Sequence, residues 1–234
     1  MPLFYAPDIL TQPELPDEEA QHAIRVLRMA VGDELTITDG CGSFYQAEIA
    51  TIQGRHCTVN IRQAQPQAPL WTGRLHLAIA PTKNLDRMEW LAEKATEIGV
   101  DELTFLCCRY SERRVIKTDR IRRVVVAAMK QSLKARLPQV NEMTDFTPFV
   151  TQPRSGQRFI AHCHPGLKPH LHTCLSSGQD ALVLIGPEGD FSEEEVARAI
   201  ACGYQPVTLG PSRLRTETAA LVACQLMNLA HTVG

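Results

Sequence analysis

Two short segments near the C-terminus combine glycine and proline with charged residues, a composition that suits a ligand-binding loop. GPEG at 186–189, here called the first corner, follows the apolar run 182–185; GPSRLRT at 210–216, the second corner, follows the run 206–209. Each apolar run is predicted to be a buried strand, and glycine at its end permits a tight turn and close approach of a ligand to the backbone. Ligands in open α/β sheets bind beyond the carboxyl ends of strands. The two corners are therefore predicted to form two walls of one pocket.

The charged residues at the end of the second corner are candidates for catalysis. Arg215 and Glu217 lie in LRTETA at 214–219. An arginine can stabilise negative charge that develops on a substrate oxygen, and a carboxylate can accept a proton. Each residue also has a structural alternative, which is a salt bridge for Arg215 and, for Glu217, interaction with the dipole of a helix that begins nearby.

The segments after Arg74 predict the framework that holds these corners. Short apolar runs alternate with helical patterns, which is typical of a largely parallel sheet with helices on both faces. The predicted strands are 75–80, 103–108, 159–161, 182–185 and 206–209. The predicted helices are 85–98, which ends at Gly99, a basic helix at 117–137, one capped by Ser192 and Glu195, and one at about 216–231. The last helix is apolar nearly all round, so it is expected either in the core or against another subunit.

Residues 1–67 are predicted to form a small β-rich domain, and residues 72–234 the α/β domain. A helix is expected over 15–29, with Ile24 and Leu27 facing inward. The stretch 63–69, rich in Gln, Pro and Ala, is predicted to be a linker. The predicted strands of this domain are 34–38, 43–50 and 58–62, with a turn at 39–42 between the first two.

Positive charge is concentrated in one region. The segment from Arg109 to Arg136 holds ten Lys or Arg and two acidic residues, a local charge of +8 in a chain whose net charge is −2. Four of these cations share one face of the predicted helix at 117–137: Arg120, Arg123, Lys130 and Lys134. A polyanion such as RNA would be drawn to this face. The alternative is a solvated helix face without a partner.

Other classes of protein find little support. The longest apolar runs fall short of the ~20 residues that cross a bilayer, and the N-terminus lacks a secretory signal pattern, so a cytoplasmic protein is expected. The eight cysteines form no CxxC pair and are predicted to be reduced thiols. The His and Cys residues between His162 and Cys174 fit no common zinc spacing, so no metal is predicted. His162 or His164 could instead border the ligand pocket.

Both corners lie in long motifs that resemble the signature loops of a known family. LIGPEGDFS at 184–192 and LGPSRLRTETA at 209–219 are similar to those of the RsmE-type ribosomal RNA methyltransferases of the SPOUT class. HAIRVLR at 22–28 and MKQSLKARLP at 129–138 resemble two further segments of that family. Two positions depart from the family pattern, because Asp190 stands where a second glycine is expected and Leu133-Lys134 where Gly-Arg is common.

The resemblance implies both a fold and an activity. It implies a PUA-like β-barrel in residues 1–67 and a methyltransferase domain with a trefoil knot in residues 72–234. It implies a homodimer that transfers the methyl group of S-adenosylmethionine to N3 of a uridine in the 16S ribosomal RNA of the small subunit. Two alternatives stay open: a SPOUT relative that modifies another RNA position, such as a ribose, and a non-catalytic RNA-binding protein of ribosome assembly.

The implied ligands define the site residues that we expect. S-adenosylmethionine offers an adenine edge that needs backbone donors and acceptors, and a sulfonium that needs carbonyl or negative surroundings. The expected cofactor-binding residues are Leu184, Ile185, Gly186, Pro187, Glu188, Gly189, Leu209, Gly210, Leu214, Arg215 and Thr216. The expected RNA-binding residues are Arg25, Arg28, Lys83, Arg120, Arg123, Lys130, Gln131 and Lys134. Uracil N3 carries a proton, so Arg215 is expected to stabilise the uracil anion, while Glu217, a water or another subunit could accept the proton.

Overall fold

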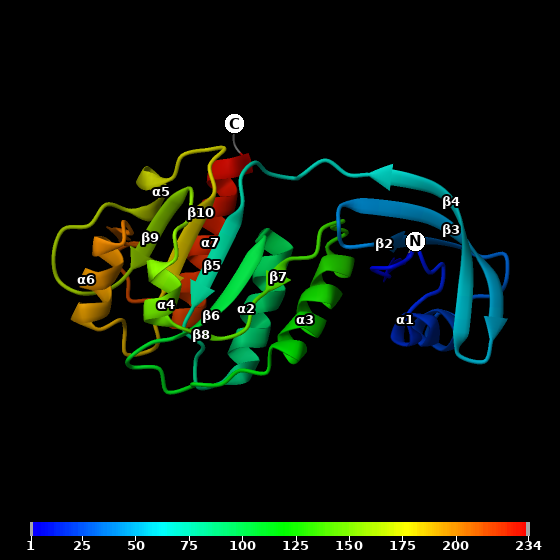
Figure 1. Ribbon diagram of the computed structural model, residues 1–234, viewed down its shortest axis with the longest axis horizontal. Helices are drawn as coiled ribbons and strands as arrows, with labels where there is room; N and C mark the ends of the chain where they lie inside the picture. Colours follow the sequence, from blue (N-terminus) through cyan, green and yellow to red (C-terminus); the bar gives the residue numbers. More distant parts are fainter. Residues whose placement is uncertain (1, 233–234) are drawn as a thin grey trace. The chain divides into compact units, whose positions relative to one another are not determined.

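The computed structural model describes residues 2–232, and the chain divides into two compact units (Figure 1). The N-terminal unit contains Met1–Pro69 together with Val126–Leu137, and the C-terminal unit contains Leu70–Val125 and Pro138–Gly234. The chain therefore passes between the units after residues 69, 125 and 137. The domain boundaries predicted from the sequence, 1–67 and 72–234, place the segment 126–137 in the C-terminal unit instead.

A four-stranded sheet forms the framework of the N-terminal unit, in the order β1-β2-β3-β4. β1 (Leu3–Tyr5) is parallel to β2 (Glu34–Thr38), whereas β3 (Ser43–Gln53) and β4 (His56–Pro66) continue the sheet antiparallel. The core of the unit is built from the inward side chains of these strands, including Leu35 and Ile37. The predicted hairpin of 34–38 with 43–50 is confirmed, and β1 is an element that the sequence pattern did not predict.

Two predictions for the N-terminal unit are wrong. The expected helix over 15–29 is shorter, since α1 (Asp17–Gln21) continues only as η1, a π-helical turn at His22–Val26, and Leu27 is 40% exposed. The expected linker at 63–69 begins too early, because β4 continues to Pro66, where it pairs with Ser43 of β3. Pairing with a long neighbouring strand has overridden the weak strand propensity of the Gln and Pro residues.

The segment 126–137 joins the N-terminal unit through the end of α3 (Thr118–Gln131) and the turn that follows it. The helix ends six residues earlier than expected, and Leu133 adopts the left-handed conformation with φ 52°. The backbone N–H of Gly42 donates to the carbonyl of Ala135 at 2.9 Å. This hydrogen bond connects the turn after α3 to the small β-rich unit.

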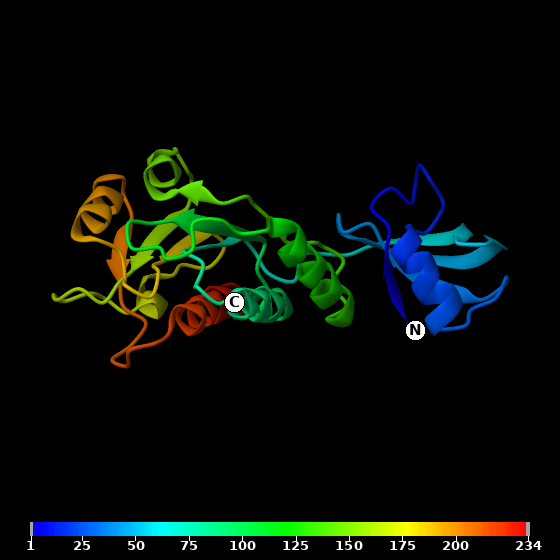
Figure 2. The same cartoon turned by 90° about the horizontal axis from the view of Figure 1, so that it is seen from below.

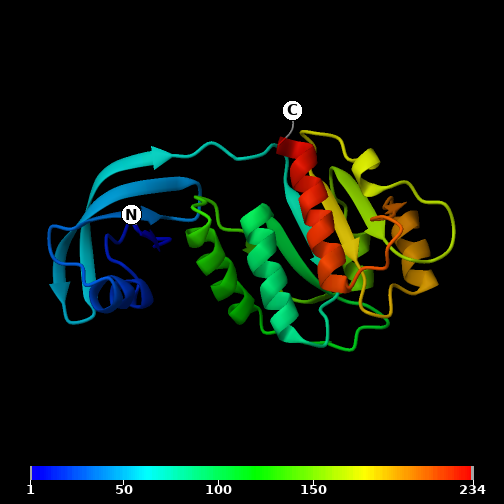
Figure 3. The ribbon, with the colours of Figure 1, turned by 180° about the vertical axis from the view of Figure 1, so that it is seen from behind.

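A seven-stranded parallel sheet forms the C-terminal unit, in the order β11-β9-β10-β5-β6-β7, with β8 also beside β6. The predicted parallel α/β class is confirmed. Figures 2 and 3 show α2 and α7 together on one face of this sheet, with α4 and α6 on the other. The strands are β5 (Leu75–Ile79), β6 (Glu102–Cys107), β7 (Gln139–Val140), β8 (Thr144–Asp145), β9 (Gln157–Ala161), β10 (Ala181–Ile185) and β11 (Gln205–Val207).

The helices of this unit begin and end at residues with clear physical roles. Asn84 caps α2 (Leu85–Ile98), and a Cβ at Gly99, where α2 ends with φ 130°, would lie 2.7 Å from the ring of Trp71. The predicted capping box of Ser192 and Glu195 is confirmed at α6 (Glu193–Ala201). The remaining helices are α4 (Phe146–Thr151), the short α5 (Leu171–Cys174) and α7 (Thr216–Thr232).

The last helix, α7, buries one face within its own chain. Ala220, Ala223, Cys224 and Met227 are fully buried, and α7 packs against α2, β5 and β10. Leu229 on another side is 40% exposed, so this chain does not cover the helix all round. None of the helices described within residues 2–232 combines the length and hydropathy that a bilayer crossing requires.

Candidate active site at the carboxyl ends of the strands

The two corners leave the sheet at the same edge and at the same level. β9 lies between β10 and β11, and all three strands run parallel. Ile185 at the end of β10 and Val207 at the end of β11 are both in register with Ala161 of β9. With strands spaced about 4.8 Å apart, the two strand ends are separated by about 10 Å. The two strand ends therefore lie close together, and that the corners form two walls of one pocket stays a prediction.

The first corner is tied to the loop that follows β5. The backbone N–H of Lys83 donates to Oε1 of Glu188 at 3.0 Å. Arg113, from the loop after β6, donates to the carbonyls of Thr82, at 3.1 Å, and of Lys83. The Cβ position of Gly189 lies 3.2 Å from Cβ of Tyr110, so any larger residue there would crowd this side chain. Three loops are thus fixed to one another by contacts between a side chain and the backbone.

The second corner is held by hydrogen bonds around Thr208. Its backbone bonds to Pro169 and Leu171 fix the end of β11, and its Oγ1 accepts from the N–H of Gly210 at 3.2 Å. Gly210 has φ 124°, and a Cβ built there meets no atom within 4 Å. Backbone groups at this glycine therefore border open space. Leu209 and Leu214 are half-buried beside it.

The two catalytic candidates have different environments. Arg215 is exposed, and within residues 2–232 it forms no ion pair, so the structural salt bridge considered for it is not observed. Glu217, in the first turn of α7, is only 7% exposed. Its Oε1 lies 3.5 Å from Nη1 of Arg87, and its Oε2 is buried without a hydrogen bond. Arg87 was not singled out from the sequence, although its place in the first turn of the helix after β5 puts it at the same edge of the sheet.

The segment after β9 contacts the two residues that follow the first corner, and whether His162 or His164 borders the ligand pocket stays a prediction. His164 Nε2 lies 2.7 Å from the carbonyl oxygen of Phe191. Burial lowers the pKa of His162, and nearby Lys168 acts in the same direction, so this imidazole is neutral near pH 7. Among the described residues, no three His, Cys, Asp or Glu side chains are grouped in a way that could hold a metal ion.

Two of the four cations on the basic face predicted for α3 form ion pairs. Arg120 pairs with Glu89 of α2, and Lys130 pairs with Glu19 of α1, a carboxylate whose side chain is 10% exposed. Acidic partners far away in the sequence thus offset the charge of these two residues, which makes them less available to a phosphate. Arg123 is exposed, as are Gln131, Arg25 and Arg28; Lys134 is half-buried, and Lys83 lies 3.2 Å from Glu112. RNA contact by this set stays a prediction.

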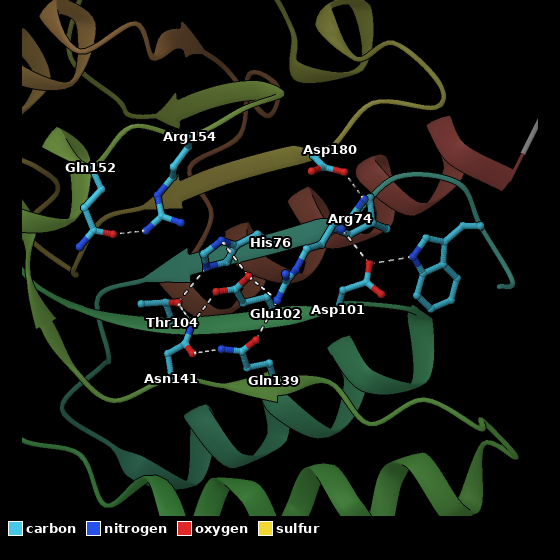
Figure 4. A network of polar contacts seen from close by, with 12 residues as sticks. Arg74, His76, Asp101, Glu102, Thr104, Gln139, Asn141, Gln152, Arg154 and Asp180 are labelled. Atoms are coloured by element: carbon cyan, nitrogen blue, oxygen red, sulfur yellow. Dashed lines mark hydrogen bonds and ion pairs between the residues drawn. The ribbon is translucent and has the colours of Figure 1, made fainter. Parts of the chain in front are cut away.

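A second polar cluster of the C-terminal unit lies at the opposite, amino-terminal edge of the sheet (Figure 4). Glu102 of β6 accepts from Asn141 at 2.6 Å and pairs with Arg74 at 2.9 Å. His76 of β5 bonds through Nε2 to Oγ1 of Thr104 at 2.8 Å. Burial, aided by nearby Arg154 and Arg74, lowers the pKa of His76 to about 3, so its 3.6 Å contact with Glu102 involves a neutral imidazole.

Comparison with known proteins decides the family. The family model described as the RNA methyltransferase domain matches residues 69–228, and the RNA methyltransferase PUA domain matches residues 15–62. The chain belongs to the RNA methyltransferase family. The resemblance of the two corner motifs to that family is therefore confirmed, and so is a PUA-like domain near the N-terminus.

Three relatives show how much of the chain this membership covers. A ribosomal RNA small subunit methyltransferase E from Synechocystis is 31% identical, over 87% of this chain and 68% of the relative. The crystal structure of a probable rRNA methyltransferase from Porphyromonas gingivalis has a TM-score of 0.94 at 46% identity, covering 100% of this chain and 99% of that one. A ribosomal RNA small subunit methyltransferase E from Neisseria gonorrhoeae, solved with bound S-adenosyl methionine, has a TM-score of 0.86 at 26% identity, covering 98% and 97%.

Proposed function

We propose that this methyltransferase uses S-adenosylmethionine to methylate N3 of a uridine in the 16S ribosomal RNA of the small subunit. The observation that carries the proposal is the common level of the two corners on either side of β9. The cofactor bound in the Neisseria relative supports the same ligand here. In this proposal residues 1–67 act as a PUA-like RNA-binding domain and residues 72–234 as the catalytic domain.

The residues at the two corners fit the cofactor. A Cβ at Gly186 would crowd the backbone, because it would lie 3.0 Å from the backbone nitrogen of Phe191, whereas Gly210 borders open space. One corner is thus closely packed, and the other leaves room for a ligand. Backbone groups of both corners would bind the adenine and the methionine portion, with Leu209 and Leu214 as apolar surroundings. The bound cofactor supplies an electrophilic methyl group on a sulfonium.

Arg215 is assigned the role of stabilising the uracil anion. Methyl transfer to N3 requires loss of the N3 proton, which leaves negative charge shared with the neighbouring carbonyl oxygens. Arg215 is an exposed cation with no ion pair among the described residues, so its guanidinium is available for such an oxygen. Glu217 is assigned a positioning role through Arg87, because its buried Oε1 lies 3.5 Å from the Arg87 guanidinium, while its Oε2 has no hydrogen-bond partner among the described residues. Water or a group from a second subunit then remains as the proton acceptor.

The remaining family properties are proposed on the resemblance. We propose a homodimer, a trefoil knot in the C-terminal domain and a cytoplasmic location, where the ribosomal RNA is found. The partly exposed side of α7 at Leu229 is compatible with a second subunit. The oligomeric state is measured directly by light scattering of the purified protein, and a monomer at micromolar concentration would contradict this part of the proposal.

Two measurements test the proposed activity. Calorimetry should detect binding of S-adenosylmethionine, and incubation with small-subunit particles or 16S RNA should transfer one methyl group that mass spectrometry places on a uracil N3. A methyl group on a ribose or another base would favour the alternative of a SPOUT relative with a different target. Absence of cofactor binding would favour a non-catalytic RNA-binding protein and overturn the proposal.

A further inference from the structure

Asp190, directly after the first corner, adopts a backbone conformation that side chains rarely take. Its φ is 67°, and the only other non-glycine residues with positive φ among those described are Arg28 and Leu133. Glycine adopts this conformation readily, whereas other residues are disfavoured there and Asp or Asn are tolerated best. This explains why the family pattern favours glycine here, and it raises the question of what the carboxylate contributes.

The carboxylate of Asp190 joins the first corner to the segment after β9. Its Oδ2 accepts from the backbone N–H of Cys163 at 2.7 Å, and its Oδ1 accepts from the N–H of Phe191 at 2.8 Å. A second bond lies beside the first, because His164 Nε2 is 2.7 Å from the carbonyl of Phe191. Residues 190–191 and 163–164 are thus connected at two points, which we call the 163–190 latch.

The position of the latch gives it a consequence for the site. Cys163 and His164 follow β9, the strand that separates the two corners, and the three strand ends share one level. The bonds between residues 190–191 and 163–164 therefore fix the first corner relative to the segment that lies between the two corners. A loop held in its binding conformation before the ligand arrives loses less conformational entropy on binding, and its affinity is correspondingly higher.

We propose that Asp190 is a positioning residue, which fixes the first corner in its cofactor-binding conformation by bonding the backbone of Cys163. The proposal rests on the proposed function, since it concerns the affinity of that site for S-adenosylmethionine. In this chain the conformational cost of a side chain at positive φ is offset by two charge-assisted hydrogen bonds.

The test compares two substitutions at Asp190 with a matched aspartate at the other edge of the sheet. Asp190→Gly keeps the left-handed conformation and removes the tie, whereas Asp190→Asn keeps one oxygen acceptor. Asp180 is the control, because its Oδ1 also accepts a backbone N–H, that of Arg74 at 2.9 Å, but at the amino-terminal edge. The measurements are calorimetry with S-adenosylmethionine, steady-state kinetics, and hydrogen exchange of the Cys163 amide.

The expected result is a change in cofactor affinity with little change in turnover. Asp190→Gly should raise the Kd and KM for S-adenosylmethionine about tenfold, leave kcat within about twofold, and speed exchange at Cys163 in the protein without ligand. Asp190→Asn should recover part of the affinity, and Asp180→Asn should leave the Kd unchanged. Parental affinity and parental exchange in Asp190→Gly would overturn the positioning role. Failure of the parental protein to bind the cofactor would instead overturn the proposed function.

Discussion

Polar side chains at the two edges of the parallel sheet differ in the partners to which they bond. At the amino-terminal edge, Asp101 and Asp180 accept backbone N–H groups, but most of the polar bonds join two side chains: Glu102 bonds to Asn141 and Arg74, and His76 to Thr104 (Figure 4). At the carboxyl edge, carboxylates bond to the backbone of neighbouring loops, as Glu188 does with Lys83. The first arrangement forms a closed network between strands that are already paired. The second fixes loop shape and leaves the remaining groups of those loops available to a ligand.

The difference shows that the polar clusters of this domain serve different purposes. Glu102, with a side chain that is 12% exposed, and neutral His76 are enclosed, so their removal should be felt in the free energy of unfolding. Arg215 is exposed and has no carboxylate partner within residues 2–232, an environment that suits contact with a substrate anion. Substitutions at the amino-terminal edge should therefore mainly lower stability, and substitutions at the carboxyl edge should mainly lower activity.

The largest effect is expected for Arg215→Ala at the carboxyl edge. Turnover should fall by about 100-fold or more, because removal of a group that stabilises transition-state charge typically has this effect. The free energy of unfolding and the affinity for RNA should change little. Methyl transfer is followed with labelled S-adenosylmethionine and small-subunit RNA, with Arg213→Ala, an exposed neighbour, as the control. Turnover at the parental rate would show that Arg215 has no part in catalysis.

Glu102→Ala should have the converse effect at the amino-terminal edge. It removes one acceptor from each of Asn141 and Arg74, which keep their bonds to Thr104 and Gln139. The free energy of unfolding should fall by about 2 kcal/mol, a figure reduced for the half-exposed guanidinium of Arg74. Urea denaturation of the domain measures this loss. In Glu188→Ala, a change at the other edge, stability should fall by less than about 1 kcal/mol while the KM for the cofactor rises. Equal destabilisation by the two variants would contradict the comparison.

His76 should make the stability of the C-terminal domain depend on pH. Its folded pKa of about 3 lies below the ordinary 6.5, so the unfolded chain binds a proton that the folded protein does not. Stability from this residue is fully present above pH 6.5 and is lost as the pH falls toward 3. Between pH 7.5 and 5.5 the free energy of unfolding should fall by about 1.4 kcal/mol more than in His76→Gln. Parallel pH profiles of the two proteins would mean that folding does not lower the pKa of His76.

The smallest effect is expected on the basic helix α3. Arg123→Gln should weaken RNA binding about threefold and reduce the slope of log K against log salt by about one, because one phosphate contact is lost. Lys130→Gln, at a cation already paired with Glu19, should leave that slope unchanged and lower the stability of the N-terminal unit instead. Filter binding at several salt concentrations separates the two. A larger loss of RNA affinity in Lys130→Gln than in Arg123→Gln would indicate that Lys130 binds a phosphate.

The sequence by itself determined the elements whose signals are local. The end of α2 at Gly99, the capping box of α6, the alternation of strands and helices, and the glycine corners all depend on residues a few positions apart, so pattern and propensity suffice. The two corner motifs also identified the family. None of these features depends on a contact between residues that lie far apart in the sequence.

The tertiary structure decided which groups are free and which are engaged. Lys130 meets Glu19, Glu217 meets Arg87, and Asp190 meets the amide of Cys163, each pair lying far apart along the chain. Likewise, only pairing with β3 extends β4 to Pro66, and only enclosure makes His76 neutral. Charge state and hydrogen bonding depend on the neighbours that folding brings together, and a local pattern contains no information about those neighbours.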